Sequence, residues 1–535
     1  MNERSLRTGF FTSAERYPDR EALTVGKERL TYRDLARRAL TIAATLAAHD
    51  AGEGTPLTAV YGHRHPTAFA AVLGALARGH GYVPLNPAFP PERCASMLER
   101  AHARAVVVDP TAEARLPELL DGAAGSLVVV LPDRAEVGDL RARFPDHTLL
   151  GASDLVAPAA GREGVGAVFG EVAPDDVAYL LFTSGSTGRP KGVGVAHRNV
   201  LPFVDAMVER YAIGPDDRFS NTFDLTFDLS VFDMFCAWER GACLCVPTAQ
   251  DKMLPGKWVK REALTVWFSV PSTGVLMSRL RMLKPDAYPT LRWALFCGEA
   301  LPVDLVARFA AAAPNATLEN LYGPTELTIA CTLYRYDPTT AREESLHGVV
   351  PIGEPYPGMD VRVVDDALRS VARGHDGELL MTGPQMTPGY WEDPERTAKA
   401  FVVPPGETRT YYRTGDLVRW PEGGPLLYLG RADHQIKIQG YRVELGEVEE
   451  VLRRVSGADV AIALGWPRTA SGADGIVGFV GVTDADLDAL LAEARAKLPA
   501  YMQPSRLLGV GSFPLNANGK VDRKALLSRL EAEAT

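Results

Sequence analysis

The 535-residue chain has little cysteine and no long apolar run, and both absences exclude classes of protein. Six cysteines are too few for the disulfide framework of a small secreted domain. Cys243 and Cys245 lie two positions apart, but no second Cys or His pair follows at a zinc-binding spacing, so their apolar surroundings predict a strand. Without a membrane-spanning run or an N-terminal signal pattern, the sequence favours the cytoplasm.

Positive charge is also in short supply. The chain has 57 Lys and Arg residues against 67 Asp and Glu residues, which gives a formal net charge of −10. There is no long basic run, so we expect neither a nucleic acid nor a membrane as a partner. The length exceeds what one ordinary hydrophobic core supports, and at least two domains are expected.

Short β-rich runs alternate with longer helical patterns through most of the chain. Buried strands are predicted over 106–108, 127–131 and 178–182, and a helix is predicted over 35–48 with Thr31 as its cap. Because strands and helices alternate, the sequence predicts an α/β architecture with largely parallel sheets.

A domain boundary is predicted near 430–433. The elements expected after it are helices and strands in mixed order: a helix over 444–455, strands over 460–464 and 476–482, a helix over 486–498, a strand over 507–510 and a short helix from Asp522. We therefore predict two domains, a long α/β domain over 1–432 and a small α+β domain over 433–535.

The segment from Thr183 to Gly192 follows an apolar strand and reads TSGSTGRPKG. Its glycines let backbone N–H groups approach an anion, its hydroxyls add donors, and Lys191 adds a charge that can follow a phosphate. A Walker loop needs Gly-Lys-Ser/Thr after four residues, whereas Pro190 precedes Lys191 here and Gly192 follows it. The loop predicts phosphate binding and excludes a Walker-type NTPase.

This loop resembles the phosphate loop of the adenylate-forming superfamily, which comprises acyl-CoA synthetases, luciferases and the adenylation domains of nonribosomal peptide synthesis. Further blocks similar to that family follow in family order: 320–326, 377–379 with 382–383, 412–417, 430–444 and 516–520. The resemblance implies a large N-terminal domain of stacked mixed sheets with flanking helices, and a small mobile α+β C-terminal domain.

The resemblance also implies an ATP site that uses Mg²⁺. Tyr322 offers a ring for adenine stacking, Asp416 can accept both ribose hydroxyls, and Glu326 is a hard oxygen ligand suited to Mg²⁺. The residues that the family pattern assigns to ATP are Thr183, Ser184, Gly185, Ser186, Thr187, Gly188, Lys191, Asn320, Tyr322, Gly323, Thr325, Asp416, Arg431 and Lys520.

Catalysis, by the same resemblance, falls to Lys520 together with Thr183, Lys191 and Glu326. Lys520 is expected to stabilise charge that develops at the α-phosphate. Asp433 corresponds to the family's hinge, and the segment from Gln435 to Arg442 resembles the one that turns into the active site for the second half-reaction. Many relatives carry Arg where this chain has Gln439, which puts a basic contact there in doubt.

The substrate is expected to be an amino acid, because Asp228 matches the family aspartate that pairs with an α-ammonium group. A buried carboxylate without a cation would be costly. The other positions carried over to the substrate pocket are uncharged: Leu229, Phe232, Phe268, Leu295, Cys297, Leu321, Ile329 and Ala330. They disfavour Asp, Glu, Lys and Arg, and favour a small amino acid such as alanine. The segment 295–302 resembles that of D-alanine–carrier protein ligases, although Cys297 alone could be a small buried hydrophobe.

The acceptor is expected to be the phosphopantetheine thiol of a separate carrier protein, because only 15 residues follow Lys520. The chain would then be a free-standing, AMP-forming amino acid–carrier protein ligase of nonribosomal peptide or natural-product synthesis. A small activating partner protein, the carrier and the chirality of the substrate stay open. Two alternatives remain: an acyl- or aryl-CoA synthetase, against which Asp228 argues, and a non-catalytic adenylation-like protein, against which the intact loop, Glu326 and Lys520 argue.

Overall fold

The computed structural model describes residues 4–49, 55–158, 170–184, 190–431, 435–438, 440–469, 472–483, 485–514 and 521–533. Two large sheets form its centre. The first contains seven strands, and all neighbours are parallel except the pair β8 and β9. In spatial order they are β7 (Thr148–Leu150), β6 (Val128–Val130), β5 (Ala105–Val108), β3 (Leu57–Tyr61), β4 (Gly81–Leu85), β8 (Val177–Thr183) and β9 (Lys191–Ala196).

The second sheet contains nine strands and is parallel from β14 to β1, with antiparallel strands at both edges. In spatial order they are β16 (Glu354–Pro355), β15 (Thr332–Arg335), β14 (Thr317–Tyr322), β13 (Trp293–Phe296), β12 (Val266–Ser269), β10 (Arg218–Ser220), β11 (Cys243–Val246), β1 (Glu21–Val25) and β2 (Glu28–Thr31).

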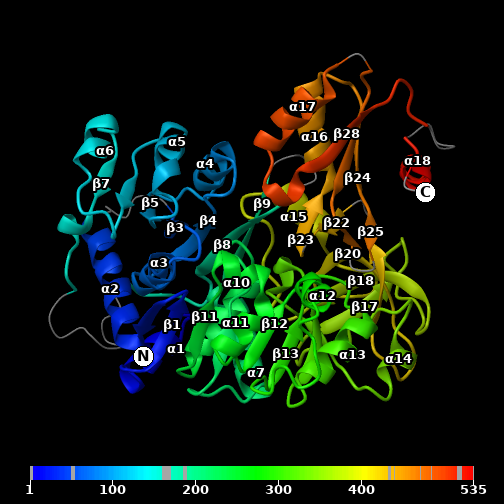
Figure 1. The fold of residues 1–535 in the computed structure, drawn as a ribbon, viewed down its shortest axis with the longest axis horizontal. Coiled ribbons are helices and arrows are strands. Elements are labelled where there is room, and N and C mark those ends of the chain that lie inside the picture. Colours follow the sequence, from blue (N-terminus) through cyan, green and yellow to red (C-terminus); the bar gives the residue numbers. More distant parts are fainter. Residues whose placement is uncertain are drawn as a thin grey trace.

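Helices cover both sheets. They are α1 (Thr8–Arg16), α2 (Tyr32–His49), α3 (Pro66–Ala77), α4 (Pro91–Arg100), α5 (Leu116–Asp121), α6 (Gly138–Arg143), α7 (His197–Arg210), α8 (Leu229–Val231), α9 (Ala237–Glu239), α10 (Ala249–Met253), α11 (Pro255–Arg261), α12 (Pro271–Arg279), α13 (Val303–Ala312) and α14 (Ala341–Glu344). Helix α2 contacts β1 and β2 of one sheet and β6 of the other, and α3 contacts β3, β4 and β5. These two helices therefore lie between the sheets (Figure 1).

Alternation along the strands explains this layering, because successive side chains point to opposite faces. In β5, Ala105 and Val107 join the core between the sheets, whereas Val106 and Val108 join the outer core under α4 and α5. In β11, Cys243 and Cys245 share the outer face with residues of α11 to α13. The predicted strand character of the cysteine segment is confirmed, and so are the strands predicted over 106–108, 127–131 and 178–182.

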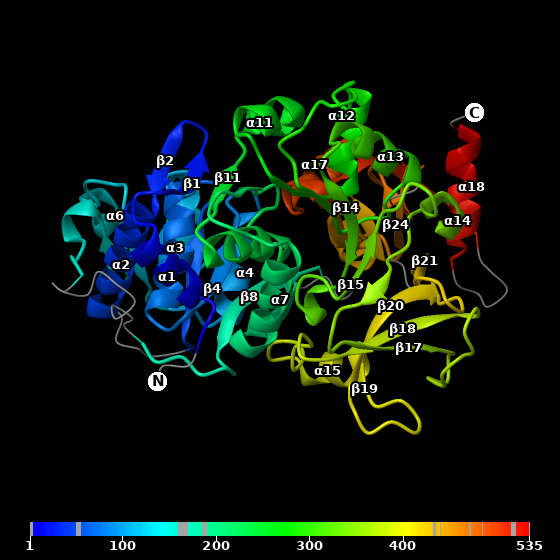
Figure 2. The same ribbon diagram turned by 90° about the horizontal axis from the view of Figure 1, so that it is seen from below.

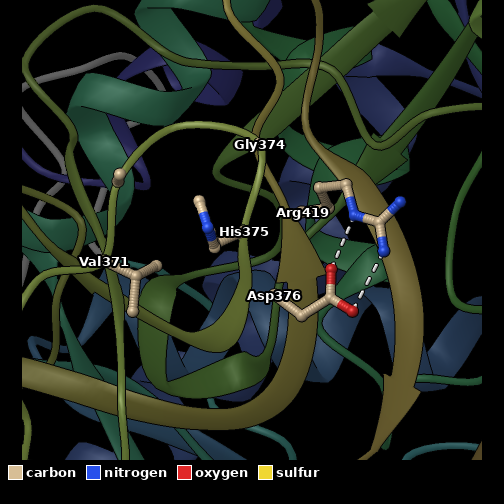
Figure 3. Close-up of a pocket in the computed structure, with 6 residues that line it drawn as sticks. Val371, Gly374, His375, Asp376 and Arg419 are labelled. Carbon is tan, nitrogen blue, oxygen red and sulfur yellow. Dashed lines mark hydrogen bonds and ion pairs between the residues drawn. The ribbon is translucent and has the colours of Figure 1, made fainter.

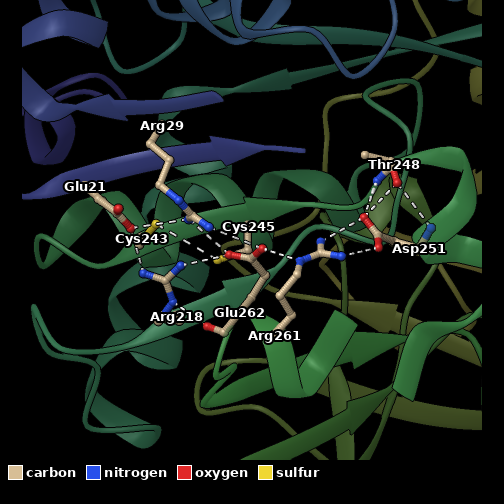
Figure 4. Close-up of polar contacts among 9 residues, drawn as sticks. All are labelled: Glu21, Arg29, Arg218, Cys243, Cys245, Thr248, Asp251, Arg261 and Glu262. Carbon is tan, nitrogen blue, oxygen red and sulfur yellow. Dashed lines mark hydrogen bonds and ion pairs between the residues drawn. The ribbon is translucent and has the colours of Figure 1, made fainter. Parts of the chain in front are cut away.

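Ion pairs around the buried Glu262 join the β1–β2 edge of the nine-stranded sheet to β10 and α11 (Figure 4). The Glu262 side chain, 1% exposed, contacts Arg29 and Arg218 at 3.1 Å each and Arg261 at 3.0 Å. Arg218 also pairs with Glu21 of β1 at 2.9 Å. Since a buried carboxylate needs partners, these arginines allow Glu262 to remain charged at the sheet edge.

The predicted helix over 35–48 is confirmed as α2, and the Thr31 hydroxyl accepts a hydrogen bond from the Asp34 N–H at 3.1 Å, as expected of a cap. A third, antiparallel sheet follows, made of β17 (Asp360–Val364), β18 (Asp376–Thr382), β20 (Tyr411–Arg419), β19 (Phe401–Val402) and β21 (Leu427–Arg431), with α15 (Pro394–Ala400) beside it. Figure 2 shows β17 to β20 grouped at one side, away from the blue N-terminal elements.

The elements after residue 434 form a small α+β domain with its own two hydrophobic clusters. They are β22 (Gln435–Ile438), β23 (Tyr441–Glu444), α16 (Leu445–Ser456), β24 (Ala461–Gly465), β25 (Arg468–Thr469), β26 (Gly472–Ala473), β27 (Ile476–Val480), α17 (Leu487–Ala496), β28 (Pro504–Gly509) and α18 (Arg523–Glu533). The predicted elements of this part are confirmed to within a few residues. The boundary at 432/433 stays a prediction, because 432–434 lie outside the described residues.

Candidate active site

Residues of both large sheets meet at the carboxyl ends of their parallel strands. Thr183 ends β8, Tyr322 ends β14, Cys297 follows β13, and Asp228 lies in the segment after β10. Ligands of open α/β sheets bind outside such strand ends, because the loops that leave neighbouring strands in opposite directions leave a crevice between them. All four residues line one cavity of about 110 Å³. The structure therefore brings together residues that lie as far as 139 positions apart between Thr183 and Tyr322.

Lys191 and Glu326 form a buried ion pair in this region. The Lys191 Nζ lies 3.1 Å from Glu326 Oε1 and 3.3 Å from the Tyr390 hydroxyl, which itself donates to Glu326 Oε1 at 2.7 Å. Arg442 Nη1 lies 3.6 Å from Glu326 Oε2. Burial alone would raise the pKa of Glu326, but Lys191 and Arg442 outweigh it and hold that pKa well below its usual range. Glu326 is thus held ionised.

Burial acts on Lys191 in the opposite sense. The loss of hydration lowers the pKa of its ammonium group, although Glu326 opposes the shift. The side chain is 8% exposed and also lies over the Tyr390 ring, 4.9 Å from its centroid. Lys191, the lysine of the predicted phosphate loop, therefore lies beside Glu326, the carboxylate that was predicted to hold Mg²⁺.

Asp416 forms a second buried cluster. Arg431 donates to Asp416 Oδ1 at 2.8 Å, and the Tyr322 hydroxyl donates to Asp416 Oδ2. Arg431 also donates to the Thr414 carbonyl at 3.1 Å, which fixes the guanidinium next to the strand that carries Asp416. The three residues predicted for one nucleotide, Tyr322, Asp416 and Arg431, are in direct contact.

Asn320 and Gly323 lie at a narrower cavity beside the main one, which Tyr322 and Lys437 also line. The Asn320 amide donates to the Pro351 carbonyl at 2.8 Å, while its Oδ1 is buried without a hydrogen-bond partner. The Thr183 hydroxyl is buried in the same unsatisfied state. Buried polar atoms without partners are rare in proteins, so these two oxygens indicate a site that a polar ligand completes.

Asp228 lies on the wall of the main cavity and is 7% exposed. Its Oδ2 accepts the Ile329 N–H at 3.1 Å. Burial raises the pKa of its carboxyl group to about 6, and hydrogen bonds from Ile329 and Thr325 limit the rise. No cationic side chain pairs with Asp228 among the ion pairs of the described residues. The carboxylate is therefore in the state that an arriving cation would stabilise.

The residues predicted for the substrate pocket divide into two groups. Leu229 and Cys297 line the cavity with Asp228, and burial raises the pKa of the Cys297 thiol to about 12. The remaining six are buried in the core between the sheets and do not line that cavity: Phe232, Phe268, Leu295, Leu321, Ile329 and Ala330. The rings of Phe232 and Phe268 pack against each other, with centroids 4.9 Å apart.

The segment after residue 434 reaches into the same site. Gln435, Lys437, Tyr441 and Arg442 all line the main cavity. The Ser184 hydroxyl donates to the Arg442 carbonyl at 2.7 Å and accepts a hydrogen bond from the Glu444 N–H at 3.3 Å. The phosphate-loop side of the site is thereby joined to the small domain.

Several predicted residues lie outside the described residues. They are Gly185, Ser186, Thr187 and Gly188 of the loop, the hinge Asp433, the departure at Gln439, and Lys520. Their roles stay predictions.

Sequence reasoning did not assign individual roles to Tyr390, Lys437 or Arg442, all of which face the site. Burial lowers the pKa of Lys437, which lies near Asp416. A signal existed only for Lys437 and Arg442, which belong to the segment expected to turn into the active site. Tyr390 lies in none of the motifs.

A further cavity lies at the surface, away from the residues described above. A shallow cavity of about 390 Å³ lies beside β18, where Asp376 and Arg419 pair with each other and His375 points in (Figure 3). Within the described ranges, no group of three or more His, Cys, Asp or Glu side chains is placed to hold a metal ion. In the same part of the chain, no helix is both long enough and apolar enough to span a membrane.

Comparison with known proteins agrees with the geometry of the site. Residues 10–391 match the family model described as AMP-binding enzyme. The chain is 36% identical over 522 residues to an L-proline--[L-prolyl-carrier protein] ligase of Streptomyces coelicolor, with 94% of this chain and 92% of that protein covered. It is also 32% identical to tyrocidine synthase 3 of Brevibacillus parabrevis, of which it spans 8% of the length.

A solved structure supports the same assignment. The Vibrio cholerae adenylation domain AlmE, in complex with glycyl-adenosine-5'-phosphate, superposes with a TM-score of 0.87 at 31% identity, and 98% of each chain is covered. The fold is therefore that of an adenylation domain. The chain belongs to the AMP-binding enzyme family, which confirms the resemblance to the adenylate-forming superfamily.

Proposed function

We propose that this protein activates a small, uncharged amino acid as its aminoacyl-AMP and transfers it to the phosphopantetheine thiol of a carrier protein. It would be an AMP-forming amino acid–carrier protein ligase. The observation that carries the proposal is the buried carboxylate of Asp228, which shares one cavity with Thr183, Tyr322 and Asp416. Two relatives of similar length support the reaction class, since both are L-proline--[L-prolyl-carrier protein] ligases.

ATP fits the polar groups around the cavity. Adenine would lie against the Tyr322 ring, where an exocyclic amino group could donate to the unpartnered Oδ1 of Asn320. The ribose hydroxyls would bind Asp416, with Arg431 holding that carboxylate. Thr183 has a buried hydroxyl for a phosphate oxygen. The predicted roles of Ser184, Thr325 and the loop glycines belong to the same proposal.

Mg²⁺ fits Glu326, because its Oε2 is buried without a hydrogen bond while its charge is retained. Mg²⁺ is commonly held by one or two carboxylates together with substrate phosphates. When bound, it would neutralise charge on the phosphates. Lys191 lies beside Glu326, so its ammonium group is close enough to move from this carboxylate to an oxygen of a bound phosphate.

In the first half-reaction, a carboxylate oxygen of the amino acid attacks the α-phosphorus of ATP, a new O–P bond forms, and pyrophosphate leaves with the electrons of the broken bond. This chain positions the two reactants and compensates charge, which is the main source of rate in such chemistry. We assign the charge compensation to Lys191 and, from the family pattern, to Lys520.

The proposed substrate is small and uncharged because the remaining pocket positions hold apolar side chains. Phe232 and Phe268 pack against each other, and Leu295, Leu321, Ile329 and Ala330 belong to the same buried core. A charged side chain would find no partner among these groups. Alanine is the favoured candidate, with Asp228 binding its ammonium group and Cys297 bordering its side chain.

In the second half-reaction, the thiol of the carrier attacks the carbonyl carbon and AMP leaves. The small domain, over 433–535, is proposed to rotate about Asp433 between the two steps. The contacts of Ser184 with Arg442 and Glu444 support this assignment, because they join the small domain to the active site.

The test is amino-acid-dependent exchange of pyrophosphate into ATP, measured with the unmodified protein and a panel of substrates. The panel contains both alanine enantiomers, glycine, proline, a large amino acid and a charged one. We expect the highest kcat/KM with a small uncharged amino acid. Exchange with only a large or charged amino acid would refute the pocket assignment.

A further inference from the structure

A second cavity, of about 590 Å³, adjoins the active-site cavity. The two share Phe227, Leu229, Gly440 and Tyr441 as wall residues, so the second cavity adjoins the first at the segment that carries Asp228. His63 and Asp224 line only the second cavity. Neither residue has a role in the adenylation step described above.

His63 and Asp224 come from different sheets. His63 follows β3 of the seven-stranded sheet, and Asp224 lies in the segment after β10 of the nine-stranded one. The carboxyl ends of both sets of parallel strands face each other, and this brings His63 Nδ1 within 2.7 Å of Asp224 Oδ2. An ionised carboxylate can only accept hydrogen bonds, so Nδ1 carries the proton and Nε2 is the basic nitrogen.

Asp224 is firmly held in the ionised state. Asn86 donates to its Oδ2 at 3.0 Å, and Thr226 donates to its Oδ1 through the backbone N–H at 3.0 Å and through the hydroxyl at 2.6 Å. Burial alone would raise the pKa of Asp224, but the hydrogen bond from His63 and the other donors outweigh it and lower that pKa. The carboxylate can therefore orient His63 and stabilise its imidazolium form, as in other His–Asp pairs.

Several other charged or titratable groups surround this pair. Asp109 accepts the backbone N–H of His63 at 2.9 Å, and Arg64 donates to the carbonyls of Asn221 and Thr222. Lys252 lies on the same cavity wall, and burial, followed by the charge of Arg64, lowers its pKa to about 8. Asp251, which pairs with Arg261, and Arg279, Asp474 and Tyr441 complete the ionisable groups of the wall.

The His63 side chain is 33% exposed, so its ring reaches the cavity space instead of being enclosed by protein. A pair that served only to join the two sheets would gain nothing from an open imidazole face. An oriented His whose ring is partly exposed in a cavity is instead the arrangement of a general base.

We propose that His63, oriented by Asp224, is the general base for thiol transfer, an inference that rests on the proposed function. The thiol proton passes to Nε2 of neutral His63 as the sulfur attacks the carbonyl carbon of the aminoacyl-AMP. The C–S bond forms, the bond between the carbonyl carbon and the phosphate oxygen breaks, and AMP leaves with that electron pair. The imidazolium then returns the proton to water. A base is useful because a thiol is only a few per cent ionised at pH 7.

The test compares the two half-reactions in His63→Gln. Enzyme-bound aminoacyl-AMP is formed first and mixed with pantetheine, and thioester formation is followed by rapid quench from pH 6 to 10. At pH 7 we expect the ratio of thiol transfer to pyrophosphate exchange to fall about 100-fold, which is typical of a lost general base. The deficit should shrink as the pH passes the pKa of the thiol, because the thiolate then forms without help. Asp224→Asn should show a smaller loss with the same pH dependence.

A more acidic thiol separates proton transfer from binding. With 2,2,2-trifluoroethanethiol, His63→Gln should approach the rate of the unmodified protein at pH 7. His375→Gln, at the exposed cavity beside β18, is the matched control and should leave both half-reactions unchanged. An equal loss for His63→Gln at every pH and with both thiols, or no loss at all, would overturn the proposal. A failure of the proposed function itself would differ, since the unmodified protein would then show no amino-acid-dependent exchange.

Discussion

Replacing Asp228 by Asn is expected to weaken amino acid binding and, at the same time, to stabilise the folded protein. The carboxyl group is 7% exposed, and burial raises its pKa from 3.8 to about 6. At about 1.4 kcal/mol per pKa unit, keeping this carboxylate charged costs the free protein about 3 kcal/mol at neutral pH. The ammonium group of the substrate offsets that cost in the complex.

For catalysis, the neutral amide that Asp228→Asn introduces cannot form an ion pair with an ammonium group. Truncating one partner of a buried charge pair costs about 2–5 kcal/mol, so we expect the KM for the amino acid in pyrophosphate exchange to rise by about 30-fold or more. In the unmodified protein the same KM should fall as the pH rises through about 6, where Asp228 ionises, and level off above it. The pH dependence should be absent in Asp228→Asn.

Asp228→Asn weakens substrate binding, but we expect it to increase the stability of the folded protein. A carboxyl whose folded-state pKa is raised favours folding below its unfolded pKa, and this contribution is lost as the pH rises from about 4 to 6. The asparagine side chain keeps an oxygen to accept the Ile329 N–H and carries no charge. Thermal unfolding at pH 8 should therefore show a higher melting temperature for the variant, with the difference vanishing at pH 4. A KM within threefold of the unmodified value, or a lower melting temperature at pH 8, would refute the reasoning.

Three further predictions concern other residues of the site. Lys520→Ala should abolish most pyrophosphate exchange while thiol transfer from pre-made aminoacyl-AMP continues, and normal exchange would sink the assignment. Glu326→Gln should lower the exchange rate about 100-fold and raise the Mg²⁺ concentration needed for half-maximal rate, because Lys191 and Arg442 lose their shared carboxylate. Leu229→Ala should shift the preference among amino acids towards larger side chains by about 10-fold in kcat/KM, and an unchanged ranking in the substrate panel would contradict its place on the pocket wall.

Much of the fold could be predicted because its signals are local. Short continuous apolar runs predicted β5 and β8, and helical periodicity with a threonine cap predicted α2. The pairing of strands could not be predicted in this way. Neighbours such as β1 and β11 are separated by more than 200 residues, and their register depends on the whole core.

In the candidate site, too, some features could be predicted from local motifs and others depend on the packing of distant segments. The motifs predicted that Lys191, Glu326 and Asp416 would act together, and the structure brings the first two into contact. Identity at a motif position could not predict that Phe232 or Phe268 packs in the core instead of lining the cavity, since that depends on side-chain direction. The pairing of His63 with Asp224 joins two sheets and lies in no motif, so only the three-dimensional arrangement reveals it.

Amino acid activation is tested most directly by detection of the adenylated product. The protein is incubated with ATP, Mg²⁺ and either alanine or propionate, which has the same carbon skeleton without the ammonium group, and the bound nucleotide is analysed by mass spectrometry. We expect alanyl-AMP with alanine and only a trace of propionyl-AMP, because the buried Asp228 carboxylate requires a cation. Equal or greater formation of propionyl-AMP would contradict amino acid activation and favour an acyl-CoA synthetase.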